Sequence, residues 1–130
     1  MEWNSHRYLE LYYAVPGLGA VLHTVNIRYS PEDLVYTINH AGDEILFVKD
    51  EFVPLVSAIM PKLKTVRKAV IMTDRSEPPQ VKLPGIEVYN YEDLIKSSSP
   101  YEFGDIDERT VATLFYTSGT TGPPKCILYP

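Results

Sequence analysis

Residues 45–72 read ILFVKDEFVPLVSAIMPKLKTVRKAVIM and contain two short apolar runs separated by a longer amphipathic stretch. The runs at 45–48 and 69–72 are continuous rather than alternating, which is typical of strands covered on both faces. Between them, apolar residues recur at helical spacing over 52–63, and Pro61 is expected to kink or end that helix. A strand, a helix and a second strand in this order favour a parallel pair of strands with the helix packed against them.

Helices and strands are also predicted upstream of this unit. An amphipathic helix opens the chain and ends at Pro16 and Gly17, and residues 20–25 form a strand. The next helix begins at Ser30, because serine is a good N-cap and Pro31 suits the first helical position. Each predicted strand therefore has a helix next to it in the sequence.

The alternation continues downstream. The polar, proline-bearing stretch 74–84 is predicted to be a surface loop. Residues 86–89 form a strand, Asn90 caps a short helix, and residues 111–116 form a further strand. The predicted fold class is therefore α/β, with a mainly parallel sheet and flanking helices.

Size and charge narrow the class of protein. The 130 residues fit one domain, and 45% hydrophobic with 22% charged residues is ordinary globular composition. A formal net charge of -5 disfavours nucleic acid and anionic membranes as partners. No apolar run reaches membrane-spanning length and the one cysteine cannot form an internal disulfide, so we predict a soluble, cytoplasmic protein. The chain opens inside a helix and stops inside an apolar run at 126–128, so both ends are expected to be cut rather than natural.

Residues 116–125, YTSGTTGPPK, form the segment with predicted chemistry, and we call them the phosphate loop. A strand leads into small hydroxyl residues, among which Gly119 and Gly122 tolerate positive φ and place no Cβ in the way of a ligand. Lys125 adds a positive charge, and charge-assisted hydrogen bonds are about twice as strong as neutral ones. The two prolines before it stiffen the exit, so the loop is not expected to run straight into a helix. This composition suits a grip on the phosphates of a nucleotide. The predicted binding residues are Thr117, Ser118, Gly119, Thr120, Thr121, Gly122 and Lys125.

Two common phosphate-binding motifs are excluded by the residues present. A Walker loop has Gly-Lys followed by Ser or Thr, whereas Lys125 follows Pro124 and precedes Cys126. A dinucleotide fingerprint needs a third glycine after Gly17 and Gly19, but the sequence has a leucine at that position. Gly17 and Gly19 are therefore interpreted as turn residues.

The phosphate loop resembles the signature loop of the adenylate-forming superfamily, which comprises acyl-CoA synthetases, luciferases and the adenylation domains of peptide synthetases. Residues 3–10, 14–26 and 30–41 are similar to medium- and long-chain fatty acyl-CoA ligases. The resemblance covers nearly the whole chain and is weakest over 73–105. It implies that residues 1–130 form a single partial AMP-binding domain, which is part of the large N-terminal domain of such an enzyme.

The resemblance also implies a reaction. In this family a carboxylate attacks the α-phosphate of Mg-ATP to give acyl-AMP and pyrophosphate, and the thiol of CoA then displaces AMP. The expected cofactors are ATP and Mg²⁺, with CoA as co-substrate and a fatty acid as the carboxylic acid. The family's loop closes over the β- and γ-phosphates, and Thr117 is expected near the magnesium. Where the family has glycine this sequence has Cys126, interpreted as a small buried residue that starts the next strand, with a reactive thiol as the alternative.

Several segments that the family needs for catalysis have no counterpart in the sequence, among them the adenine-binding segment and the C-terminal domain with its lysine. The chain alone is therefore expected to be inactive, as a fragment that works with the remaining segments of a ligase. The alternatives are a non-catalytic nucleotide- or phosphate-binding α/β module, a subunit of a split enzyme, and an interaction protein that pairs a free sheet edge with another chain.

The histidines carry no predicted role. His6, His23 and His40 lie seventeen residues apart, a spacing that matches no metal site. We interpret each of them as a core or surface residue.

Overall fold

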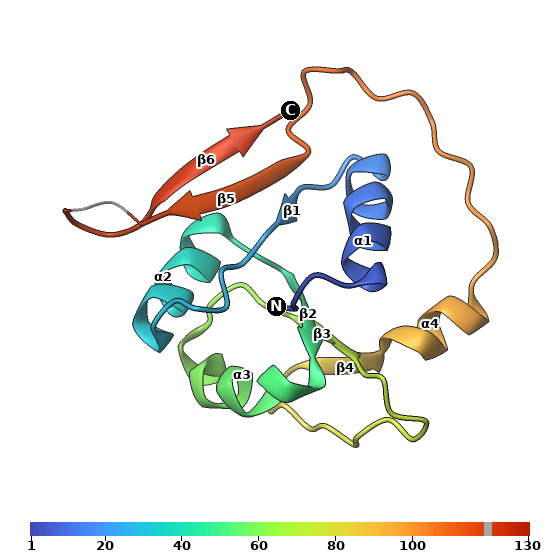
Figure 1. Ribbon diagram of the computed structural model, residues 1–130, viewed down its shortest axis with the longest axis horizontal. Helices are drawn as coiled ribbons and strands as arrows, with labels where there is room; N and C mark the ends of the chain where they lie inside the picture. Colours follow the sequence, from blue (N-terminus) through green and yellow to red (C-terminus); the bar gives the residue numbers. More distant parts are fainter. Residues whose placement is uncertain (119–120) are drawn as a thin grey trace.

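The computed structural model describes residues 1–118 and 121–130, and its helices and strands alternate in the order that the sequence predicts (Figure 1). The helices are α1 (His6–Gly17), α2 (Pro31–Ala41), α3 (Val53–Ile59) and α4 (Tyr91–Ser97), with the 3-10 turns η1 (Asp50–Phe52) and η2 (Met60–Lys62) on either side of α3. The strands are β1 (Leu22–His23), β2 (Ile45–Lys49), β3 (Lys68–Met72), β4 (Glu87–Asn90), β5 (Thr113–Thr117) and β6 (Lys125–Tyr129).

Strands β2, β3 and β4 form a parallel sheet with β3 in the centre. Alternate residues of β3 face opposite sides: Ala69 and Ile71 pack in a cluster with α2 and α3, whereas Val70 and Met72 pack in a cluster with α1 and α4. Helices therefore cover both faces of this sheet, which explains why its strands are continuous apolar runs. The strand-helix-strand unit predicted over 45–72 is confirmed.

The remaining strands form a second sheet in the order β1-β5-β6, where the sequence predicted a single, mainly parallel sheet. Strands β1 and β5 are parallel, but β5 and β6 are antiparallel, with Thr117 opposite Lys125. Residues 118–124 are enough to close a hairpin, whereas a parallel pair needs a crossover of about a dozen residues or more. The strand predicted over 20–25 is reduced to the two residues of β1. The α/β class and the mainly parallel strand pairing are confirmed, and the strands are divided between two sheets instead of one.

Helix boundaries follow the capping residues that the sequence predicted. The Ser30 side chain accepts a hydrogen bond from the Asp33 N–H at 3.2 Å, and the Asn90 side chain does the same for the Asp93 N–H at 3.2 Å. Helix α2 ends at Gly42, whose φ of 72° is a left-handed conformation that glycine adopts readily. Side-chain hydrogen bonds thus set where α2 and α4 begin, and the left-handed backbone of Gly42 sets where α2 ends.

The helix predicted over 52–63 is shorter than expected. Only α3 is α-helical, and the chain tightens into the 3-10 turns η1 and η2 before and after it. Pro54 and Pro61 each lie in the first turn of a segment, where the missing N–H sacrifices no hydrogen bond within the helix. No helix in the described part of the chain is both long and apolar enough to span a membrane.

Candidate phosphate-binding site

The described residues of the phosphate loop lie at the outer end of the β5–β6 hairpin, which projects from the rest of the molecule (Figure 1). Thr117 is the last residue of β5 and Lys125 is the first of β6, and the two face each other in the antiparallel register. The hairpin therefore brings together the two ends of the predicted binding loop. Both residues are exposed, so a hydroxyl and an ammonium group are open to a ligand.

The described residues inside the loop are open to solvent as well. Ser118, Thr121 and Gly122 are exposed. Gly122 has a φ of 84°, and a Cβ there would meet no heavy atom of the described residues within 4 Å. Backbone conformation rather than lack of space therefore favours glycine at this position. Gly119 and Thr120 lie outside the described residues, and their binding role stays a prediction.

The exit of the loop is anchored by packing. Pro124 is buried and is followed directly by β6, so the loop leads into a strand and not into a helix, as predicted. Cys126 lies in β6 opposite Tyr116 and is half-buried. This position agrees with the interpretation of Cys126 as a small residue at the start of a strand, although its side chain is less buried than expected.

Tyr116, the first residue of the phosphate loop, is held by neighbours that lie far from it in the sequence. Its hydroxyl oxygen lies 2.8 Å from Nδ1 of His40, near the end of α2. Its carbonyl oxygen accepts a hydrogen bond from the Tyr29 hydroxyl at 3.1 Å. Its ring packs against the rings of His40 and His23, with centroids 5.8 and 5.3 Å away. Tyr116 is only 7% exposed, so the base of the loop is buried although its tip is open.

His23 is itself paired with Asp43, which follows the end of α2. Nδ1 of His23 and Oδ2 of Asp43 are 2.6 Å apart, and the two side chains are 6% and 12% exposed. The carboxylate can only accept, so the ring N–H at Nδ1 donates this hydrogen bond. Because both residues are shielded from water, the bond fixes the orientation of the ring that packs on Tyr116.

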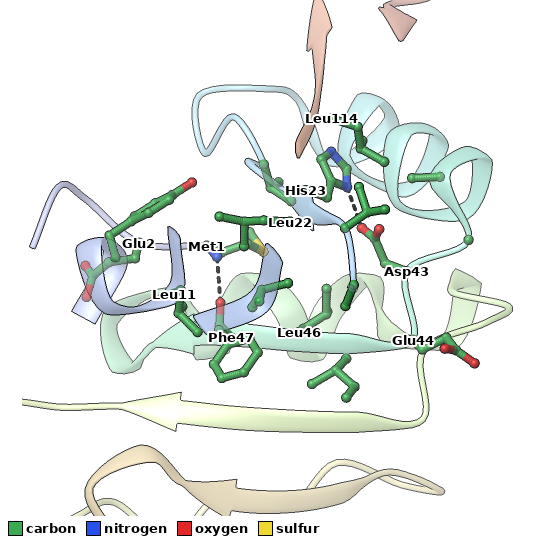
Figure 2. Close-up of a pocket in the computed structure, with 18 of the residues that line it drawn as sticks. Met1, Glu2, Leu11, Leu22, His23, Asp43, Glu44, Leu46, Phe47 and Leu114 are labelled. Carbon is green, nitrogen blue, oxygen red and sulfur yellow. Dashed lines mark hydrogen bonds and ion pairs between the residues drawn. The ribbon is translucent and has the colours of Figure 1, made fainter. Parts of the chain in front are cut away.

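Figure 2 shows the His23–Asp43 pair at the edge of a cavity of about 520 Å³ between α1, β1 and β2. Most of the side chains that line it are apolar, and Leu114 of β5 forms part of its wall. Figure 2 shows the carboxylates of Glu2 and Glu44 pointing away from the cavity, and the carboxylate of Asp43 is paired with His23, so the wall offers few polar groups to a charged ligand. The cavity is therefore a poor site for nucleotide phosphates, and the exposed loop is the better one.

The environment of Tyr116 determines where its proton lies. Burial raises the pKa of the Tyr116 hydroxyl above its ordinary value, and the neighbouring thiol of Cys126 raises this pKa further. The phenol therefore keeps its proton at neutral pH, and we assign it as the donor of the hydrogen bond to Nδ1 of His40. We assign the ring proton of a neutral His40 to Nε2 accordingly.

Two of the three histidines thus lie next to each other at the base of the phosphate loop. The side chain of His23 is buried and His40 lies on the surface, which agrees with the interpretation of the histidines as core or surface residues. The sequence signal for this convergence is weak. Gly42 ends α2 between His40 and Asp43, and the parallel pairing of β1 with β5 places His23 beside the strand that carries Tyr116. Among residues 1–118 and 121–130, no three His, Cys, Asp or Glu side chains gather in a metal-binding group.

Residues 1–130 match the family model described as AMP-binding enzyme. The chain belongs to this AMP-binding family. The resemblance drawn from the phosphate loop and from the upstream residues is thereby confirmed.

Relatives of the AMP-binding chain include acyl-CoA ligases. The 3-methylmercaptopropionyl-CoA ligase of Ruegeria pomeroyi is 48% identical over 129 residues, which cover 99% of the chain and 24% of that ligase. The medium-chain-fatty-acid–CoA ligase of Ectopseudomonas oleovorans is 42% identical over 130 residues, which cover 99% of the chain and 23% of that ligase. Among solved structures, the anthranilate CoA ligase AuaEII in complex with anthranoyl-AMP is similar with a TM-score of 0.85 at 26% identity, over 98% of the chain and 23% of its own. The AMP-binding chain spans about a quarter of the length of these relatives.

Proposed function

We propose that the AMP-binding chain supplies the phosphate grip of an AMP-forming acyl-CoA ligase, together with further segments of such an enzyme. The observation that carries this proposal is the hairpin geometry, in which Thr117 and Lys125 face each other at the root of an exposed loop. Hydroxyl groups, backbone N–H groups and one ammonium group around a single loop match the acceptor oxygens of a triphosphate.

The proposed reaction has two steps. A carboxylate oxygen attacks the α-phosphorus of ATP, the bond from phosphorus to the pyrophosphate oxygen breaks, and acyl-AMP and pyrophosphate result. The sulfur of CoA then attacks the acyl carbonyl carbon, the thiol proton passes to a base or to solvent, and AMP leaves. Negative charge grows on the departing pyrophosphate in the first step. Ser118, Thr121 and Lys125 would therefore bind the transition state more tightly than the ground state.

Magnesium fits the residues at the start of the loop. Thr117 offers an exposed hydroxyl oxygen, which is a hard ligand of the kind that Mg²⁺ accepts. Magnesium usually keeps several waters and binds through substrate phosphates with few protein ligands, so a single threonine from this chain agrees with its usual coordination. When bound, the ion would neutralise part of the phosphate charge.

The acid is proposed to be aliphatic, with a fatty acid as the leading candidate and CoA as the acceptor. The relatives at 48% and 42% identity are named for 3-methylmercaptopropionyl and medium-chain fatty acyl groups, which are both aliphatic. The structural relative named for the aromatic acid anthranilate is only 26% identical. This gradient in identity supports an aliphatic substrate.

Binding of Mg-ATP to the 130-residue chain tests the phosphate grip. We expect Lys125→Ala to raise the Kd, measured by calorimetry, by about tenfold, because one charge-assisted bond to phosphate is lost. Lys82→Ala is the matched control, since Lys82 is an exposed lysine in the loop between β3 and β4. Equal Kd values for Mg-ATP in the two variants would show that Lys125 of the phosphate loop does not bind the phosphates.

Exchange of ATP with labelled pyrophosphate, in the presence of a panel of fatty acids, tests the chemistry. We expect no exchange from the chain alone, and carboxylate-dependent exchange that is lost with Lys125→Ala from a longer protein that contains it. Exchange by the chain alone would overturn its proposed inactivity. A longer protein that binds Mg-ATP and never exchanges would instead be a non-catalytic phosphate-binding module.

A further inference from the structure

We infer that His40 and the His23–Asp43 pair are positioning residues, which hold Tyr116 and through it set the orientation of the first residues of the phosphate loop. This inference rests on the proposed function of the loop. Tyr116 is the last buried residue before the exposed tip, and Thr117, proposed to lie beside Mg-ATP, follows it directly.

Each polar group of Tyr116 that can transmit orientation is fixed. The hydroxyl is bound to Nδ1 of His40, and the carbonyl oxygen is bound to the hydroxyl of Tyr29. A peptide unit is planar, so a fixed Tyr116 carbonyl also fixes the direction of the Thr117 N–H, which points the opposite way. The Thr117 N–H therefore points toward β6, where Thr117 lies opposite Lys125, and Tyr116 fixes the last paired residue of β5 from its buried side.

The rings on either side of Tyr116 are themselves oriented. The His40 ring stacks on Tyr36 of the same helix, with centroids 5.4 Å apart and planes inclined by 20°. The His23 ring is held by Asp43 at 2.6 Å. Tyr116 thus lies against two imidazoles, each of which has a second partner that restrains it.

One structural element supplies most of this support. His40 lies in the last turn of α2, and Asp43 follows the left-handed Gly42 that ends the helix. The same helix buries Leu34 and Ile38 in the apolar cluster against β2 and β3. Helix α2 therefore links the stable parallel sheet to the base of the loop, and a displacement at its end would be transmitted to Tyr116.

The contacts around Tyr116 are better suited to positioning the phosphate loop than to stabilising the fold. Tyr116 lies outside the two apolar clusters that hold the parallel sheet, and its hydroxyl is hydrogen-bonded to the ring of His40, which lies on the surface. A net hydrogen bond of this kind contributes about 1 kcal/mol to folding. Loss of the bond should leave the fold intact and release the root of the loop.

The test compares two buried tyrosines that each lose one hydroxyl. In the 130-residue chain, Tyr116→Phe removes the bond to His40, and Tyr91→Phe removes a bond of 2.7 Å to Glu10 on the other side of the molecule. The two residues are 7% and 6% exposed, so they are closely matched. We expect Tyr116→Phe to raise the Kd for Mg-ATP by about five- to tenfold and Tyr91→Phe to change it by less than about twofold, although Tyr91→Phe loses a hydrogen bond to a carboxylate and should lower the urea midpoint at least as much.

Variants of His40 supply the second arm. His40→Phe keeps a ring and removes the acceptor, whereas His40→Asn keeps a polar atom close to the place of Nδ1. We expect His40→Phe to reproduce the loss of affinity of Tyr116→Phe, no further loss in the double variant, and recovery to within about twofold of the original Kd in His40→Asn. The positioning role would be overturned if the loss of Mg-ATP affinity in each variant only paralleled its loss of stability in urea. Equal losses of affinity in Tyr116→Phe and Tyr91→Phe would overturn it as well.

Hydrogen exchange separates failure of this inference from failure of the proposed function. If the original chain binds neither Mg-ATP nor inorganic pyrophosphate, the proposed function of the chain fails, and the exchange rate of the Thr117 amide still decides the inference. We expect this amide to exchange about tenfold faster in Tyr116→Phe and His40→Phe than in Tyr91→Phe. Unchanged exchange at Thr117 in the first two variants would show that Tyr116 does not hold the root of the loop.

Discussion

The two sheets of the molecule differ in how they are held together. The parallel sheet β2-β3-β4 is packed with apolar side chains on both faces, and its central strand β3 is buried over almost its whole length. The sheet β1-β5-β6 has an exposed hairpin, and its base is held by hydrogen bonds and aromatic contacts around Tyr116. The difference separates a region that stabilises the fold from a region that presents a binding loop.

This separation has a physical reason. A loop of hydroxyls, glycines and a lysine cannot be buried without leaving polar groups unpaired, so it must project into solvent. Its position must nevertheless be defined, because a phosphate is recognised by several donors at once. A directional polar network at the root of the loop can provide that definition while the tip stays open.

The largest expected effect is a loss of stability when apolar packing against the parallel sheet is removed. Ile38→Ala removes a side chain that is 0% exposed from the cluster between α2 and the parallel sheet, and should lower the free energy of unfolding by about 2–5 kcal/mol. Leu128→Ala in β6 truncates a side chain that is 58% exposed and should change it by less than about 0.5 kcal/mol. Urea unfolding of the 130-residue chain measures both. A comparable loss in Leu128→Ala would show that the two sheets are equally part of the core.

The next largest effect is expected at Arg7, the buried polar residue beside the parallel sheet, and it is compared with the effect at Tyr116. Arg7 is 5% exposed and binds the Thr73 carbonyl, Asp74 and Glu92 at 2.9–3.0 Å, so it ties α1 to the parallel sheet and to α4. Arg7→Met leaves the buried Thr73 carbonyl without this donor and should lower stability by about 1–3 kcal/mol. The Kd for Mg-ATP should not change, in contrast to Tyr116→Phe. A higher Kd for Mg-ATP in Arg7→Met, measured at a temperature where this variant is folded, would show that the two regions are not independent.

A smaller effect is expected at Gly42, where α2 links the two regions. Gly42→Ala places a side chain at a φ of 72° and should destabilise the chain by about 1 kcal/mol through backbone strain alone, because the Cβ itself has room. Gly104→Ala is the control, since Gly104 has room for a Cβ and is not in the left-handed region. Thermal unfolding of both variants gives the difference, and equal melting temperatures would show that Gly42 is not needed to end α2.

The smallest effect is a pH dependence on the side of the parallel sheet. Hydrogen bonds from Lys49 and Arg7 lower the pKa of Asp74 below its ordinary value of 3.8. The folded state therefore favours the carboxylate. This contribution to stability is complete well above pH 4 and is lost as the pH falls through the lowered pKa. The effect is small because Asp74 is exposed to solvent.

Urea midpoints of the original chain and of Asp74→Asn, measured between pH 7 and pH 3, give this contribution. We expect a small deficit in Asp74→Asn at pH 7 that narrows toward pH 3. A deficit that stays constant with pH would mean that the pairing with Lys49 and Arg7 contributes nothing through the Asp74 charge.

Much of the local structure was predictable from the sequence because it depends on neighbouring residues. Continuous apolar runs predicted β2 and β3, and Ser30 and Asn90 predicted the starts of α2 and α4. The family and the residues of the phosphate loop were equally readable, because a motif is a local pattern. The binding roles of Thr117 to Lys125 stay predictions, to be decided by the affinity measurements.

The tertiary structure alone decided which strands pair and which side chains meet at the base of the loop. Periodicity records whether a residue is buried, but it does not record its partner, so the division into two sheets and the reversal of β6 were not predictable in this way. His23, His40 and Tyr116 are far apart in the sequence, and only the pairing of β1 with β5 and the docking of α2 bring them together. The sequence by itself therefore determined the elements and the loop, and long-range packing determined how the loop is held.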